Sequence, residues 1–114
     1  KEVLNFPCGM SRIGTVRADI DPRTKPDIIC DLKYFPFRRQ SFDVVIVDPP
    51  FSMYNKIKWI VKISDIAREI FIINGLPFAL YLKHFKMIPW LSRTPGQLFM
   101  RIWQEFIRKQ KTLD

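Results

Sequence analysis

Residues Asp48-Pro49-Pro50-Phe51 place an acid, two prolines and an aromatic ring directly after a β-branched run. The two prolines lack backbone donors and have a fixed φ, so the Pro49 carbonyl is rigid and can accept a hydrogen bond beside the Asp48 carboxylate. An exocyclic amino group has two hydrogens, one for each acceptor, and Phe51 can stack on the ring that carries the group. This pattern predicts a site for a planar amine. The alternative is an extended turn that ends a strand, with Phe51 in the core.

Small and acidic residues also follow three earlier apolar runs. The first run is followed by Pro7-Cys8-Gly9, the second ends in Asp19-Ile20-Asp21, and the third in Asp31-Leu32. Glycine permits a ligand to approach the backbone where a Cβ would obstruct it. An acid at the end of a strand is also an ordinary turn former or helix cap, so both interpretations stay open for each acid.

The elements that must position these residues are five predicted strands, at 3–6, 15–20, 27–31, 42–47 and 69–74. The last two are apolar at successive positions, which is typical of central parallel strands. Parallel strands place their carboxyl ends at one edge of an open α/β sheet, where ligands bind. We therefore expect the acids and the glycine to converge at one edge.

Helical spacing of Ile57, Ile60 and Val61 predicts an amphipathic crossover helix over 55–67. A proline near its start suggests a short helix within 75–85, and the turn signal at 94–96 predicts a terminal hairpin. The three tryptophans are interpreted as ordinary core or interface aromatics, namely Trp59, Trp90 and Trp103.

The order of these features resembles the class I S-adenosylmethionine-dependent methyltransferase family from Val3 to about Arg108, most closely over 31–51. The resemblance implies an α/β, reduced Rossmann-like fold with a mostly parallel central sheet, an antiparallel C-terminal hairpin and helices mainly on one face. We expect a single methyltransferase-like domain over residues 1–114.

The resemblance also implies a role for each strand end. The cofactor S-adenosyl-L-methionine would lie against Pro7, Cys8, Gly9, Asp19, Asp21, Asp31 and Leu32. The glycine loop would approach its methionine part, and Asp31 with Leu32 its adenine. Asp19, or Asp21 as a near alternative, would accept the ribose hydroxyls, a bond that a charged acceptor makes strong. The catalytic residues implied are Asp48, Pro49, Pro50 and Phe51, and no metal is needed.

The implied activity is methyl transfer to an exocyclic amino group of a nucleic-acid base, adenine N6 or cytosine N4, in DNA or RNA. Such an enzyme acts on a flipped or unpaired base. An alternative is a non-catalytic methyltransferase-like module that binds nucleic acid or protein, which the reduced glycine loop favours. A weaker alternative is modification of a small molecule or of a protein side-chain amide.

Short connections separate the first three predicted strands. Residues 7–14 and 21–26 are too few for helical crossovers, so one face of the sheet would lack helices although strands 42–47 and 69–74 are apolar on both sides. A bare apolar face of that size is not expected on a monomer. We therefore predict a homodimer or a partner subunit that covers it.

Nineteen Lys and Arg residues against eleven Asp and Glu give a net charge of +8, which favours a nucleic-acid partner, although solubility alone also explains it. Phosphate contacts are predicted, with a solvated surface as the alternative, at Arg38, Arg39, Lys56, Lys58 and Lys62.

Cys8 and Cys30 lack metal-site spacing, so we expect reduced thiols in a cytoplasmic protein. No apolar run approaches the roughly 18 residues of a membrane span.

Overall fold

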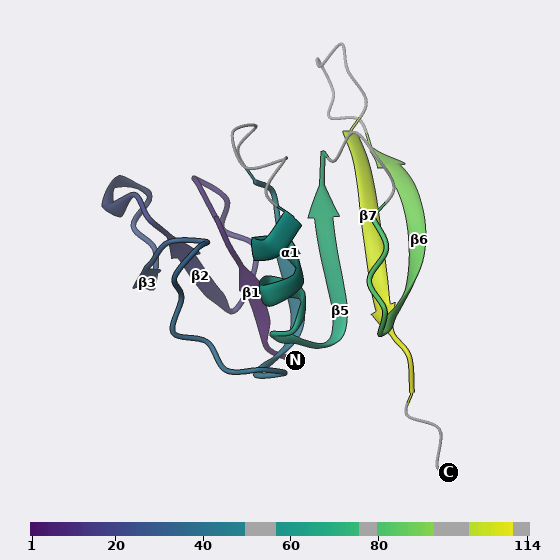
Figure 1. The fold of residues 1–114 in the computed structure, drawn as a ribbon. Helices are drawn as coiled ribbons and strands as arrows, with labels where there is room; N and C mark the ends of the chain where they lie inside the picture. The colour runs from purple at the N-terminus through teal and green to yellow at the C-terminus, as the bar shows by residue number, and fades with distance from the viewer. Residues whose placement is uncertain (50–56, 76–79, 93–100, 111–114) are drawn as a thin grey trace.

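The computed structural model describes residues 1–49, 57–75, 80–92 and 101–110, which form a seven-stranded sheet with one α-helix (Figure 1). The strands are β1 (Val3–Asn5), β2 (Val16–Asp19), β3 (Ile28–Ile29), β4 (Phe42–Val47), β5 (Ala67–Asn74), β6 (Phe85–Ser92) and β7 (Arg101–Arg108). The helix α1 spans Ile57–Ser64, and a 3₁₀ turn, η1, spans Pro22–Thr24.

The strands are arranged in the order β3-β2-β1-β4-β5-β7-β6. β1 to β5 pair in parallel, whereas β7 runs antiparallel to both β5 and β6. β4 therefore lies in the middle of the sheet. Each of the five runs predicted as a strand overlaps one of β1 to β5.

The predicted α/β, Rossmann-like fold with helices mainly on one face is wrong. The described residues form a mixed, predominantly β structure with a single α-helix of eight residues. The connection from β2 to β3 holds only η1, and the longer connection from β3 to β4 contains no helix. The short helix predicted within 75–85 is also wrong for the residues of this range that the structure describes, because residues 80–84 are non-helical and β6 begins at Phe85.

No helix in the described ranges has the length and apolarity needed to cross a membrane.

The hydrophobic core lies between α1 and one face of the sheet. From α1 it includes Trp59, Ile60 and Ile63, while Val61, predicted on the apolar side of the helix, is half exposed. The segment before β4 packs onto this core through Phe35 and Phe37, whose rings stack on each other. Both rings contact Phe6 edge-on, and Phe37 also contacts Phe42 of β4. This packing anchors the long connection without a helix.

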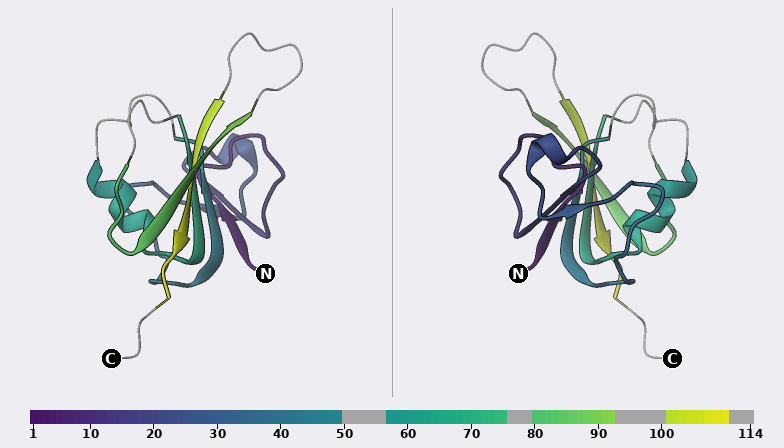
Figure 2. Two further views of the ribbon diagram at one scale, coloured as in Figure 1. Left: turned by 90° about the vertical axis from the view of Figure 1, so that its right-hand side faces the viewer. Right: turned by 90° about the vertical axis from the view of Figure 1, so that its left-hand side faces the viewer.

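The opposite face of the sheet carries no α-helix among the described residues, and Figure 2 shows α1 on one side of the sheet and the loop after β1 with η1 on the other. Side chains alternate between faces along a strand. Glu105 alternates with buried residues in this way and pairs with Ile72. Five other such side chains are apolar and half buried, and they are Val44, Ile46, Ile70, Ile72 and Ile107. We call these five residues the helix-free face.

Candidate functional site

A cavity of about 780 Å³ lies at the carboxyl ends of the parallel strands. That volume is within the range of small-molecule sites. The lining includes predicted site residues from four strand ends, namely Pro7, Cys8, Gly9, Asp19, Asp31, Leu32, Asp48 and Pro49. Other lining residues were not predicted for the site, among them Asn5, Ser11, Ile46 and Trp103. Residues far apart in the sequence thus meet around one cavity.

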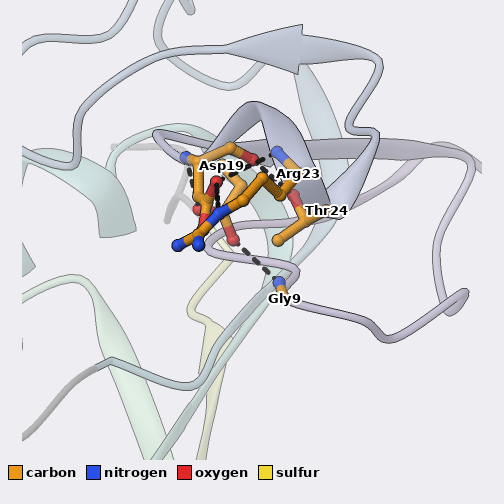
Figure 3. A network of polar contacts seen from close by, with 5 residues as sticks. Gly9, Asp19, Arg23 and Thr24 are labelled. Carbon is orange, nitrogen blue, oxygen red and sulfur yellow. Dashed lines mark hydrogen bonds and ion pairs between the residues drawn. The ribbon is translucent and has the colours of Figure 1, made fainter.

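Asp19 ends β2 and is buried, with both carboxylate oxygens already engaged by the backbone (Figure 3). The Gly9 N–H donates to Oδ2 at 2.8 Å, and the Asp21 N–H donates to Oδ1 at 3.0 Å. A carboxylate has about four acceptor positions, so each oxygen keeps one for a ligand. Two adjacent hydroxyl groups match that remaining capacity.

Asp21 does not line the cavity. It caps η1, where its side chain accepts from the Arg23 backbone N–H at 2.9 Å and from the Arg23 guanidinium at 2.9–3.2 Å. The hydrogen bonds from Arg23 lower the pKa of Asp21. Of the two acids predicted to accept the ribose, Asp19 alone faces the cavity, and Asp21 has the helix-cap role that the sequence left open.

The loop after β1 is fixed by two glycines with different roles. Gly9 has φ +53°, and a Cβ at that position would meet open space beside the cavity. Gly14 has φ +104°, and a Cβ there would stand 3.0 Å from the Val3 carbonyl oxygen. Gly9 therefore leaves room for a ligand, whereas Gly14 allows close packing of the loop against β1.

Two buried polar side chains hold the same loop. Asn5 donates from Nδ2 to the Ile13 carbonyl at 3.1 Å. Arg17 donates from Nε to the Ser11 carbonyl at 2.7 Å and from its terminal nitrogens to the carbonyls of Lys25 and Thr24. The sequence signal for both was a polar residue inside an apolar strand, because buried polar groups need specific partners.

Asp31 and Leu32 line the cavity just after β3, the strand that pairs with β2 and so neighbours Asp19. Asp31 Oδ1 accepts from the Lys33 N–H at 2.9 Å, so Oδ2 can accept a hydrogen from an amino group. Burial raises the pKa of the neighbouring Cys30 thiol, and the charges of Asp31 and Asp19 raise it further. This end of the cavity is therefore electronegative and suits hydrogen-bond donors.

Asp48 and Pro49 extend beyond β4 into the cavity lining, while Pro50 and Phe51 lie outside the described residues. Asn74, at the end of β5, donates from Nδ2 to Asp48 Oδ1 at 3.0 Å. The Asp48 side chain is exposed and Pro49 is buried. The acid thus reaches the cavity from the central strand and is held by its neighbour in the sheet.

The terminal hairpin supplies an aromatic wall to the cavity. Trp103 of β7 lines it and stacks on Trp90 of β6, with ring centroids 5.1 Å apart and planes inclined by 9°. Its Nε1 donates to Ser92 Oγ at 2.9 Å. The interpretation of these two tryptophans as ordinary core or interface aromatics did not place Trp103 at the cavity, because that position depends on hairpin register.

Comparison with known proteins gives no relative: no family model matches the chain, and a search of curated proteins finds no match. The chemistry of the site therefore has to be argued from the residues themselves.

None of the four predicted phosphate contacts within the described residues lines the cavity. Arg38 and Arg39 precede β4, and Arg39 Nε lies 3.5 Å from Asp65 Oδ2 at the amino end of β5, the opposite edge of the sheet from the cavity. Lys58 and Lys62 are exposed on α1, and Lys56 lies outside the described residues. Exposed cations next to lining residues are instead Arg12 and Lys33.

Proposed function

We propose that this chain is an S-adenosylmethionine-dependent methyltransferase that acts on an exocyclic amino group of a nucleic-acid base in DNA or RNA. The observation that carries the proposal is the convergence of Gly9, Asp19, Asp31 and Asp48 on one cavity. They belong to four separate strand ends, and each supplies the group that the proposed role requires. Their convergence depends on parallel pairing of β1 to β4, whatever covers the faces of the sheet.

The residues present fit the cofactor. The space where a Gly9 Cβ would stand is open, the Asp19 oxygens keep acceptor positions for the two ribose hydroxyls, and Asp31 Oδ2 can accept from the adenine amino group. The buried Leu32 gives an apolar surface beside that acid. When bound, S-adenosylmethionine supplies an electrophilic methyl group.

The residues after β4 would hold the amine. One amino hydrogen goes to the Asp48 carboxylate and the other to the Pro49 carbonyl, which directs the nitrogen lone pair out of the ring plane. The carboxylate also stabilises the positive charge that develops on the nitrogen, and the proton is lost during or after transfer. Stacking of the base on Phe51 remains a prediction from the sequence.

Two assays test the proposal. Calorimetry measures S-adenosylmethionine binding, and transfer of a labelled methyl group to DNA and RNA pools measures activity. Asp48→Ala should abolish transfer while cofactor binding persists, whereas Asp65→Ala, at the opposite edge of the sheet, serves as the matched control. Intact activity in Asp48→Ala would refute the mechanism.

One observation favours the alternative of a non-catalytic binding module. The loop after β1 contributes one glycine to the cavity, because Gly14 is used for packing against β1. Absence of cofactor binding at millimolar ligand, together with retained nucleic-acid binding, would favour the module. Transfer to a small amine or a protein amide, but not to nucleic acid, would favour the third interpretation.

Nucleic acid is the proposed partner because of the net charge of +8 and the exposed Arg12 and Lys33 beside the cavity. Its binding should weaken steeply as salt rises, since phosphate neutralisation releases counterions. We also propose a cytoplasmic location, because Cys8 and Cys30 are free thiols.

A second subunit is proposed on the helix-free face, a copy of this chain or a different protein. Its five half-buried apolar side chains lie together on adjacent strands β4, β5 and β7. Contiguous apolar surface of this kind marks protein interfaces. Light scattering after size-exclusion chromatography should report a dimer, and a monodisperse monomer would contradict the homodimer.

A further inference from the structure

Asn74 stands next to Asp48 because of strand register. Val47 of β4 pairs with Ile73 of β5, so the next residues along each strand, Asp48 and Asn74, lie side by side where the strands end. The Asn74 amide donates to Asp48 Oδ1 at 3.0 Å. On its other side Asn74 pairs with Trp103, which lines the cavity.

The Asn74 side chain is not explained by packing. It is 6% exposed, and its Oδ1 is buried without a hydrogen-bond partner among the described residues. Burying an unpaired acceptor is destabilising, and a leucine would fill similar space without that penalty. What asparagine adds over leucine at this position is the amide donor, which bonds to Asp48.

The bond from Asn74 contributes a defined geometry to the Asp48 side chain. Its side chain is exposed beyond the end of β4, where several staggered rotamers are open to an aspartate. A bond from a buried amide to Oδ1 selects one rotamer and fixes the direction of the second oxygen.

We propose that Asn74 is a positioning residue that holds the Asp48 carboxylate in the orientation required for the amine. The inference rests on the proposed methyl transfer. Asn74 would act through Asp48 without touching the cofactor, so its loss should lower kcat and leave cofactor affinity intact.

The kinetic test compares Asn74→Leu and Asn74→Asp with Gln104→Leu. Gln104 is a buried amide on β7 that accepts from the Leu80 N–H at 2.8 Å, and its neighbour Ile73 belongs to the core. Loss of positioning should lower kcat of Asn74→Leu by about 10- to 100-fold, with the KM for cofactor within about twofold of wild type. Asn74→Asp should be at least as impaired, because two adjacent carboxylates repel. Gln104→Leu, assayed below its melting temperature, should keep kcat.

A second measurement does not need activity and separates this inference from the proposed function. In nuclear magnetic resonance spectra of the cofactor-free protein, Asp48→Ala should shift the Asn74 side-chain amide signals and speed their hydrogen exchange. A wild-type protein that transfers no methyl group refutes the proposed function, and the spectra then still decide whether Asn74 holds Asp48. Unchanged Asn74 signals in Asp48→Ala, or wild-type kcat in Asn74→Leu, would overturn the inference.

Discussion

Asp19→Asn separates the structural role of the buried carboxylate from its proposed role as a ligand. The carboxylate accepts from the Gly9 and Asp21 N–H groups at 2.8 and 3.0 Å, one on each oxygen. An asparagine keeps one carbonyl oxygen and turns an NH2 group toward the other N–H donor. One charge-assisted bond is therefore lost, which costs about 1.5–3 kcal/mol. For a domain of this size the melting temperature should fall by about 6–12 °C.

The same substitution should weaken cofactor binding, since one of the two acceptors proposed for the ribose hydroxyls disappears. Loss of one charge-assisted hydrogen bond corresponds to about 10- to 150-fold in affinity. Thermal unfolding followed by circular dichroism measures the first effect, and calorimetry with S-adenosylmethionine measures the second. The matched control is Asp27→Asn, because Asp27 also accepts a backbone N–H, from Arg17 at 2.8 Å, but lies outside the cavity lining.

Asp27 is exposed and accepts on one oxygen, which an asparagine keeps, so the control should lose less stability than Asp19→Asn and should keep its cofactor affinity. An Asp19→Asn protein that melts within about 2 °C of wild type would refute the argument from the buried hydrogen bonds. One that loses stability but binds cofactor as tightly as wild type would refute the ribose role and keep the structural one.

Shifted pKa values at Asp43 and Cys30 give two further predictions. Hydrogen bonds from Arg68, and then from the Glu2 N–H, lower the pKa of Asp43, so the stability they confer is present above about pH 4 and is lost as pH falls through the lowered value. Asp43→Asn should therefore lose less stability than wild type between pH 7 and pH 3 in urea titrations, and equal losses would contradict this. The raised pKa of Cys30 predicts alkylation at pH 7 slower than that of a free cysteine, faster in Asp31→Asn, and blocked by a ligand in the cavity. Peptide mapping that finds Cys30 as reactive as free cysteine would contradict this.

The strands could be predicted from the sequence because each is a short β-branched or aromatic run between turn residues. Phe42–Val47 is predicted with its observed bounds, and its position in the middle of the sheet is explained by its being apolar on both faces. Parallel pairing then brings the strand ends together, so most of the cavity lining was predictable from the residues at the carboxyl end of each run.

The fold class could not be predicted because it depends on the connections. Residues 30–41 are long enough for a helix, but they form turns and irregular structure in which Phe35 and Phe37, on either side of Pro36, pack against Phe6 of the core. That packing is a tertiary effect without a local pattern. Helices mainly on one face were expected because of the resemblance to the methyltransferase family. That resemblance depends on residues in loops and at strand ends, and such residues do not determine which elements cover the sheet.

Two of the site residues that were missed depend on strand register. Asn74 reaches Asp48 because β4 and β5 pair in parallel, and Trp103 reaches the cavity because β7 pairs antiparallel with β5. Nothing local marks the position of Trp103. By contrast, Asn5 and Arg17 left a readable signal as polar residues in apolar strands, and both prove to hold the loop after β1.

The helix-free face and the cavity meet at one residue, so the proposed subunit contact and the proposed cofactor site should be linked. Ile46 lines the cavity, and Val44 lies two residues earlier on the same face, where it pairs with Ile70 of β5. A subunit seated on this face would end beside the cavity wall and support it. Ile70→Lys should therefore break the subunit contact and also weaken cofactor binding, although Ile70 does not line the cavity. Val61→Lys, on the exposed side of α1, is the control that should do neither. If light scattering finds Ile70→Lys monomeric while calorimetry finds wild-type cofactor affinity, the two surfaces are independent.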